Sequence, residues 1–118
     1  MGRVVAKIKL TNLFDLAELR RKKSKRKPRT VEVEALVDTG ATRLYLKPSV
    51  IKNLALDKVD DVLSQTTNGT RKRPVYEAVR LELMGLHVDF NVVGVDEHVP
   101  NLLGQIPLAY LDFVVDPK

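Results

Sequence analysis

The chain has 118 residues, of which 44% are hydrophobic and 30% are charged, with a formal net charge of +5, two His and no Cys. A chain of this length supports one hydrophobic core, so we expect a single domain over residues 1–118. The missing cysteines exclude a disulfide scaffold, a cysteine-ligated zinc site and thiol catalysis, and no apolar run approaches the ~20 residues of a membrane-spanning helix.

The N-terminal residues alternate between apolar and basic side chains instead of forming the apolar core of a signal peptide. We therefore predict a cytoplasmic protein with no membrane partner. The alternation over 3–10 is the period-two pattern of a half-buried strand. The apolar positions within 14–19 suit a helical turn.

Residues 20–29 form a basic block, because eight of these ten positions are Lys or Arg. Without them the chain holds 12 basic and 15 acidic residues, a net charge of −3. Like charges this dense repel one another, so we predict a solvated loop insertion at about 15–29. Nucleic-acid binding through phosphate contacts is less favoured, since no aromatic residue is interleaved to stack on bases. A third interpretation is a proteolytic cleavage site.

The rest of the chain alternates short strands with turns and short helical segments. We predict strands over 30–37 and 44–46, a helix over 50–54 that Pro48 opens, a projecting hairpin over 59–76, a second hairpin over 79–92, an apolar segment ending at 104, helical turns over 107–111 and a strand over 113–115. Asn68-Gly69 suits a two-residue turn in the first hairpin, and Met84-Gly85 forms the turn of the second.

The strand over 30–37 delivers an acidic residue directly into a glycine turn, Asp38-Thr39-Gly40-Ala41. Taken alone, Asp-Thr-Gly is a weak signal, because three residues recur by chance and an Asx-type turn has the same pattern. The context strengthens it. An apolar strand is expected to bury the carboxylate, which costs several kcal/mol unless the group is hydrogen-bonded, paired or protonated. A functional carboxylate is therefore the simplest interpretation.

After Arg29 the chain resembles the retropepsin-like aspartic proteases. The resemblance rests on Leu36-Val37-Asp38-Thr39-Gly40-Ala41, followed roughly sixty residues later by Leu102-Leu103-Gly104. It implies an all-β fold with a closed barrel-like sheet, one or two short helices and a homodimeric assembly.

The resemblance also implies roles for single residues. Asp38 is similar to the catalytic aspartate, and Thr39 to the residue whose hydroxyl braces two active-site loops against each other. Gly40 resembles the small residue that lets carboxylates and substrate come close. Ala41 resembles part of the substrate-binding wall.

Segments further along the chain are placed in the same way. The hairpin over 65–76 is similar to the flap that closes over substrate, which implies substrate contacts from Thr67, Asn68, Gly69 and Thr70. Residues 102–104 resemble the buried segment that supports the catalytic loop. Residues 111–116 resemble a terminal strand used in dimerisation.

Peptide hydrolysis without a metal or covalent intermediate needs a base for water and an acid for the carbonyl oxygen. Two carboxylates about 3 Å apart do both, because they cannot both ionise and so share one proton. The chain has one Asp-Thr-Gly, so the second carboxylate must be Asp38 of another copy, on the axis of a homodimer. We therefore predict an aspartic endopeptidase that acts on polypeptides without cofactor or metal, with a pH optimum below neutral.

Two positions depart from the retroviral pattern. Thr42 stands where an acidic residue is common, and Gln105 where an Arg is common. If those positions ordinarily form an ion pair, both partners are neutral here, so neither leaves a buried charge unpaired. Gly69 is the single glycine of the flap, which predicts a stiffer flap than the glycine-rich retroviral kind.

Two other classes of function remain open. One is a retropepsin-like module kept for dimerisation or peptide capture with negligible hydrolysis. The other is a nucleic-acid-associated protein that works through the basic block. His87 and His98 are unclustered, and the doublets Asp60-Asp61 and Asp96-Glu97 supply too few ligands, so no metal site is predicted.

Overall fold

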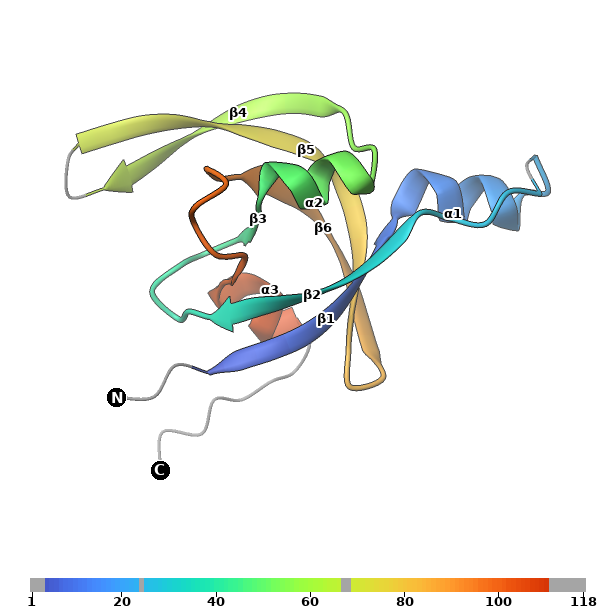
Figure 1. Cartoon of the computed structure of the whole chain (residues 1–118), viewed down its shortest axis with the longest axis horizontal. Coiled ribbons are helices and arrows are strands. Elements are labelled where there is room, and N and C mark those ends of the chain that lie inside the picture. The colour runs from blue at the N-terminus through green and yellow to red at the C-terminus, as the bar shows by residue number, and fades with distance from the viewer. Residues whose placement is uncertain (1–3, 24, 67–68, 111–118) are drawn as a thin grey trace.

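The computed structural model describes residues 4–23, 25–66 and 69–110. These residues form one mixed sheet of seven strands and three short helices (Figure 1). The strands are β1 (Val5–Asn12), β2 (Thr30–Val37), β3 (Leu44–Leu46), β4 (Lys58–Thr66), β5 (Gly69–Leu83), β6 (Leu86–Gly94) and β7 (Leu102–Leu103), and the helices are α1 (Leu13–Arg20), α2 (Pro48–Asn53) and α3 (Gln105–Tyr110). The predicted β-rich fold is confirmed, but one or two helices was an underestimate.

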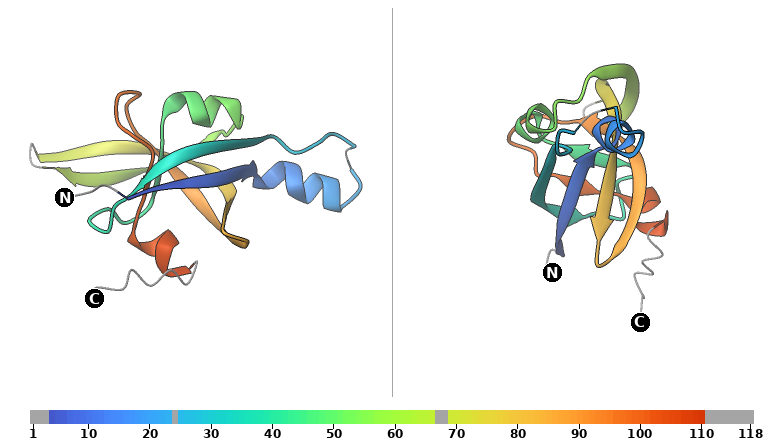
Figure 2. Two further views of the ribbon diagram at one scale, coloured as in Figure 1. Left: turned by 60° about the horizontal axis from the view of Figure 1, so that its bottom comes forward. Right: turned by 90° about the vertical axis from the view of Figure 1, so that its right-hand side faces the viewer.

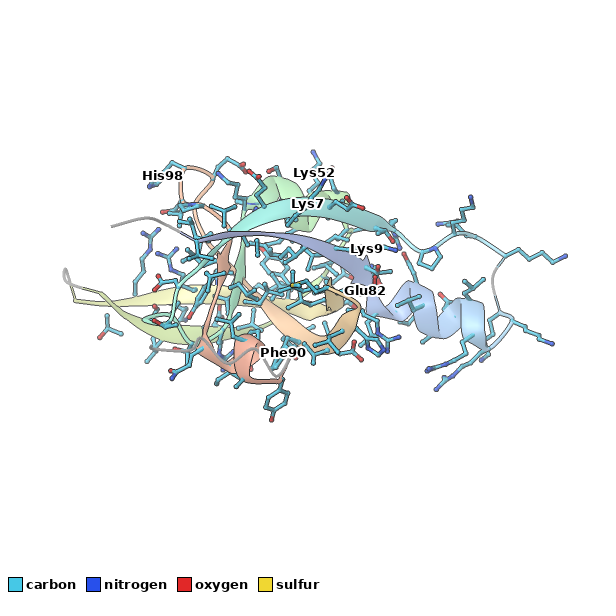
Figure 3. All side chains as sticks on the ribbon, turned by 90° about the horizontal axis from the view of Figure 1, so that it is seen from below. Lys7, Lys9, Lys52, Glu82, Phe90 and His98 are labelled. Carbon is cyan, nitrogen blue, oxygen red and sulfur yellow. The ribbon has the colours of Figure 1, made fainter. Side chains whose placement is uncertain are left out.

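The sheet curls into a near-barrel ring. Its strand order is β1-β2-β7-β3-β6-β5-β4, and β1 also pairs with β5, so every strand except β4 belongs to the ring. The right-hand view of Figure 2 shows the strands surrounding the interior. At the β1–β5 seam Lys9 lies opposite Glu82, with 3.6 Å between their charged groups (Figure 3).

The core follows from the alternation of apolar residues along the strands. Ile8 and Leu10 of β1 point inward, while Lys7 and Lys9 between them are exposed. The other core residues that are at most 1% exposed are Leu44, Leu46, Leu54, Val79, Leu81, Val92, Val93 and Leu103. The hydrophobic effect of burying these side chains holds the ring closed.

The two predicted hairpins share one long strand, β5. The sequence pattern predicted two separate strands here because the apolar–polar alternation is broken at Glu77. The structure has a register shift at this point, between Tyr76 and Ala78, within one continuous strand. The backbone N–H of Glu77 donates instead to the carbonyl of Asp57, at 2.9 Å. The turn at Met84 and Gly85 is confirmed, and both residues have positive φ, 51° and 82°.

We call β4 together with residues 69–76 of β5 the flap hairpin. The cross-strand pair nearest the tip is Thr66 with Gly69. Gly69 is therefore a strand residue, and the prediction that it is a turn residue is wrong. Glycine tolerates the φ of 110° found at this position. Thr67 and Asn68 lie outside the described residues.

The short helices follow local signals. Pro48 begins α2, as predicted, where its missing N–H costs no hydrogen bond. Helix α3 begins at Gln105, two residues before the predicted start, and the strand predicted over 113–115 lies outside the described residues. Among the helices of the described residues, none is long and apolar enough to cross a membrane.

Candidate active site

The loop that carries Asp38 begins where β2 ends. β2 pairs in parallel with β7, so Leu36 lies opposite Leu102 and Val37 opposite Leu103. The backbone N–H of Asp38 continues this ladder by donating to the carbonyl of Leu103 at 3.0 Å. The predicted supporting segment therefore contacts the predicted catalytic loop directly.

The Asp38 carboxylate is oriented by its own loop. Its Oδ1 accepts a hydrogen bond from the backbone N–H of Gly40 at 2.9 Å, and its carbonyl accepts one from the N–H of Ala41 at 3.1 Å. A Cβ atom at Gly40 would lie 3.2 Å from Oδ1, which is tighter than usual. A glycine at this position thus leaves the carboxylate room to fold over its own backbone.

The other end of the loop is clamped by a close crossing of two backbones. The N–H of Gly104 donates to the carbonyl of Arg43 at 2.8 Å, and a Cβ atom on Gly104 would lie only 2.5 Å from that oxygen. The next two N–H groups, of Gln105 and Ile106, donate to the carbonyls of Ala41 and Thr42. Hydrogen bonds from both ends therefore fix the loop over 38–43.

A buried amide ties the strands beneath the loop together. Asn101 is 6% exposed. Its Oδ1 accepts from the backbone N–H of Lys47 at 2.9 Å, and its Nδ2 donates to the carbonyl of Glu34 at 3.1 Å. Sequence reasoning missed this residue, because a polar residue before an apolar pair is indistinguishable from an ordinary loop position.

Asp38 and Thr39 are both exposed in the single chain. The expectation that β2 would bury the carboxylate is wrong for the single chain. β2 ends at Val37, and Asp38 is the first residue of a loop that leaves the sheet at an open end. Within the described residues the Thr39 hydroxyl has no hydrogen-bond partner.

A cleft of about 470 Å³ opens between this loop and the flap hairpin. The loop contributes Gly40, Ala41 and Thr42, and the flap hairpin contributes Val62, Leu63, Ser64 and Arg73. Buried residues of β6 and the following connection, Val93 and Val95, also border it. Of the predicted substrate contacts, the cleft thus includes Ala41.

Gly69 and Thr70 are exposed and do not border the cleft in the single chain. Thr67 and Asn68 are not among the described residues, so substrate contacts at 67–70 stay a prediction. Val62, Ser64 and Arg73 line the cleft but were not predicted from the sequence as cleft residues. Their signal was the alternation along the hairpin, which places every second side chain on one face.

The positions that depart from the retroviral pattern lie at the backbone crossing. Thr42 and Gln105 are both exposed, so their neutral side chains leave no charge to be compensated inside the chain. Within the described residues, no three His, Asp or Glu side chains gather as a metal site.

The predicted insertion projects from the end of the molecule opposite the flap hairpin (Figures 1 and 2). The side chain of Asn12, 3% exposed, caps α1 by accepting from the N–H of Asp15, and it donates to the Leu54 carbonyl at 2.8 Å. Arg29 closes the insertion with two side-chain hydrogen bonds to Asp15, each 2.8 Å. Hydrogen bonds of Asn12 and Asp15 therefore fix the two ends of the insertion to the rest of the fold. The described residues of the basic block are exposed, except for half-buried Pro28.

Two carboxylates outside the cleft are held in the charged state by hydrogen bonds. The side-chain hydrogen bonds from Arg29 lower the pKa of Asp15 below its ordinary value. Hydrogen bonds from the hydroxyl and the backbone N–H of Ser49 lower the pKa of Glu97. Both groups stabilise connections and lie outside the cleft.

Comparison with known proteins agrees with this geometry. The profile of the aspartyl protease family matches residues 29–105, about two thirds of the chain, and spans both β2 with its Asp38 loop and the supporting Gly104. No curated protein matches the chain significantly. A match of this extent over the site and its scaffold assigns the family: the chain belongs to the retropepsin-like aspartyl proteases.

Proposed function

We propose that the protein is a homodimeric aspartic endopeptidase in which Asp38 of each protomer supplies one carboxylate of a catalytic pair. The observation that carries the proposal is the hydrogen bond from the Gly40 N–H to Asp38 Oδ1. It orients an exposed carboxylate beside the cleft, in a loop that backbone hydrogen bonds clamp at both ends.

The need for a second copy follows from the contents of the cleft. Among the described residues that line it, none is Asp or Glu, so one protomer offers one carboxylate, Asp38, next to it. An acid and a base are both needed. A two-fold axis beside Asp38 supplies the second group without any further residue type. The exposed Thr39 hydroxyl is then available to hydrogen-bond across the axis, and residues 111–116 are the proposed dimer strand.

The reaction uses the pair in its singly protonated form. The ionised carboxylate takes a proton from water as the water oxygen attacks the peptide carbonyl carbon, and the protonated one gives its proton to the carbonyl oxygen. As the C–N bond of the tetrahedral intermediate breaks, the leaving nitrogen takes a proton from one carboxyl, and one hydroxyl of the intermediate gives its proton to the other, so the pair is again singly protonated. The flap hairpin excludes bulk water and holds the peptide by its backbone.

The test is the variant Asp38→Asn, assayed on a panel of denatured proteins at pH 4 to 9. We expect cleavage to be abolished, with an unchanged circular dichroism spectrum. Asp57→Asn is the matched control, because Asp57 is exposed and lies outside the cleft. Equal cleavage by wild type and Asp38→Asn would refute the proposal. Peptide binding without cleavage by the wild type would favour the capture module instead.

We also propose that the enzyme works in the cytoplasm and that the basic block is a solvated loop and not a nucleic-acid site. Binding to DNA that falls steeply with salt, and that vanishes when the basic residues are neutralised, would overturn the second statement.

A further inference from the structure

The charged side chains that line the cleft are both basic, Arg43 and Arg73. The Asp38 carboxylate lies beside the cleft, and no acidic residue of the described chain lines it. The body of the protein outside the basic block carries more acidic than basic residues, so this local excess of cations runs against the composition.

Arg73 lies on the inner face of the flap hairpin. Cross-strand pairing sets it opposite Val62, and two positions nearer the tip Arg71 is opposite Ser64. Directly opposite residues share a face, and Val62, Ser64 and Arg73 all line the cleft and are half-buried. In the neighbouring pair, Leu63 with Lys72, both side chains are exposed; Leu63 also borders the cleft, whereas Lys72, on the outer face, does not.

The two arginines of the inner face differ in their partners. Arg71 pairs with Asp96 at 3.3 Å, whereas Arg73 forms no ion pair with any Asp or Glu of residues 4–23, 25–66 and 69–110. A half-buried guanidinium without a carboxylate has lost part of its hydration and gained no ionic partner. Its five N–H donors match the geometry of a carboxylate.

Arg43 is the weaker of the two cations for this purpose. It is exposed, and it also borders a separate depression with Phe90 and Ile106. The rest of the lining combines buried Val93 and Val95 and half-buried Val99 and Leu102 with the polar side chains of Thr42, Tyr45 and Ser64. The cleft therefore offers one well-placed cation beside a hydrophobic surface.

We infer that the cleft selects polypeptide segments that carry an acidic side chain among apolar residues, with Arg73 as the residue that determines the preference. The inference rests on the proposed function, because it takes the cleft to be where the peptide lies. In a homodimer the same residue of the second protomer faces the other half of the peptide, so an acidic side chain is accepted on either side of the cleaved bond.

The preference can be measured without hydrolysis. We would use the Asp38→Asn protein and a set of fluorescent Ala/Leu/Phe peptides in which one Glu, or one Gln as its neutral isostere, is moved through every position. At one position or more, the Glu peptide is expected to bind about tenfold more tightly than the Gln peptide. The advantage shrinks as salt is raised, since the partners are partly solvated.

Two variants made in the same protein locate the preference. Arg73→Met is expected to make the Glu and Gln peptides bind equally, and Arg73→Lys to keep part of the difference, because it retains the charge without the fork. Lys72→Met removes the same charge from the outer face of the same strand and is expected to keep the full difference. Circular dichroism verifies that each variant is folded.

Several results would overturn the inference. They are a Glu advantage below about twofold at every position, an equal loss in Lys72→Met and Arg73→Met, or binding of no peptide at all. Hydrolysis by the wild type separates this inference from the proposed function. Cleavage without acidic preference refutes the inference alone. An acidic preference in binding, with cleavage of none of the peptides, refutes the endopeptidase and leaves the inference standing.

Discussion

Gly104→Ala is the substitution that tests most sharply how the loop that carries Asp38 is held. The added Cβ would lie 2.5 Å from the Arg43 carbonyl oxygen, 2.7 Å from the Arg43 nitrogen and 2.7 Å from the Thr42 carbonyl carbon. All three are backbone atoms, so no rotamer change can make room. To restore an ordinary contact of 3.4 Å, the oxygen would have to retreat by about 0.9 Å.

The cost can be estimated from two effects. Overpacking of a well-packed site costs about 1–3 kcal/mol. Stretching the 2.8 Å hydrogen bond from the Gly104 N–H to the Arg43 carbonyl removes about 1 kcal/mol more. We expect a loss of about 2–4 kcal/mol in the free energy of unfolding, and a shift of the Asp38 loop that lowers kcat/KM about 100-fold.

Urea unfolding measures the free energy of unfolding, and peptide hydrolysis measures kcat/KM. The unfolding is followed at one fixed protein concentration, because the stability of the proposed dimer would depend on concentration. Gly85→Ala is the control. Gly85 has a φ of 82° but open space around its Cβ position, so the substitution costs about 1–2 kcal/mol of local strain and leaves activity unchanged. If the free energy of unfolding of Gly104→Ala lies within about 0.5 kcal/mol of the wild-type value and the variant is fully active, the close approach of Gly104 to Arg43 does not hold the loop in place.

Three further predictions concern the insertion. Asn12→Ala removes the cap of α1 and leaves the buried Leu54 carbonyl unpaired, so we expect the free energy of unfolding in urea to fall by about 2–3 kcal/mol. The control Asn91→Ala, whose exposed amide donates to the Tyr76 carbonyl, should lose under about 1 kcal/mol, and equal losses would contradict the role given to Asn12. Folding lowers the pKa of Asp15, so its contribution to the free energy of unfolding is present above the ordinary Asp pKa and is lost as the pH falls through the folded pKa. The difference in urea midpoint between wild type and Asp15→Asn should therefore close below about pH 4. A difference that grows in acid would contradict the lowered pKa. Replacing Lys22, Lys23, Lys25 and Lys27 by Gln should leave kcat/KM for an uncharged peptide within about twofold of the wild-type value. The basic block and the flap hairpin lie at opposite ends of a 46 Å axis (Figure 1), and charges interact over about 10 Å at 0.1 M salt. A tenfold change in kcat/KM would show that the block takes part in catalysis.

Local signals made part of this fold predictable. The strand over 30–37 was correct at both ends, because alternation gives way to an apolar run that stops at an Asp and a glycine turn. Met84-Gly85 and Pro48 fixed a turn and a helix start through backbone preferences that depend on one or two residues. Such features need no knowledge of distant contacts.

Features that depend on long-range contacts could not be predicted. β5 was divided in two because the irregularity at Glu77 is stabilised by Asp57, twenty positions earlier in the chain. The burial of Asn101 follows from contacts with Lys47 and Glu34, which no local pattern encodes. The exposure of Asp38 was missed because the strand pattern predicts which face a side chain occupies but not where the sheet opens.

The candidate site divides in the same way. The loop over 38–41 was indicated by the Asp-Thr-Gly motif at the end of an apolar strand, and its support at 102–104 by the resemblance to the retropepsin-like proteases. The cleft residue Arg73 was not found, since its place depends on the register of the flap hairpin and on which face turns inward.

The measurement that bears most directly on the proposed shared catalytic pair is activity in mixtures of wild type and Asp38→Asn, refolded together at constant total concentration. If each site needs both copies of Asp38, activity follows the square of the wild-type fraction and falls to about a quarter in the equal mixture. A linear decline, to about half, would mean that each chain works alone and would contradict the shared pair.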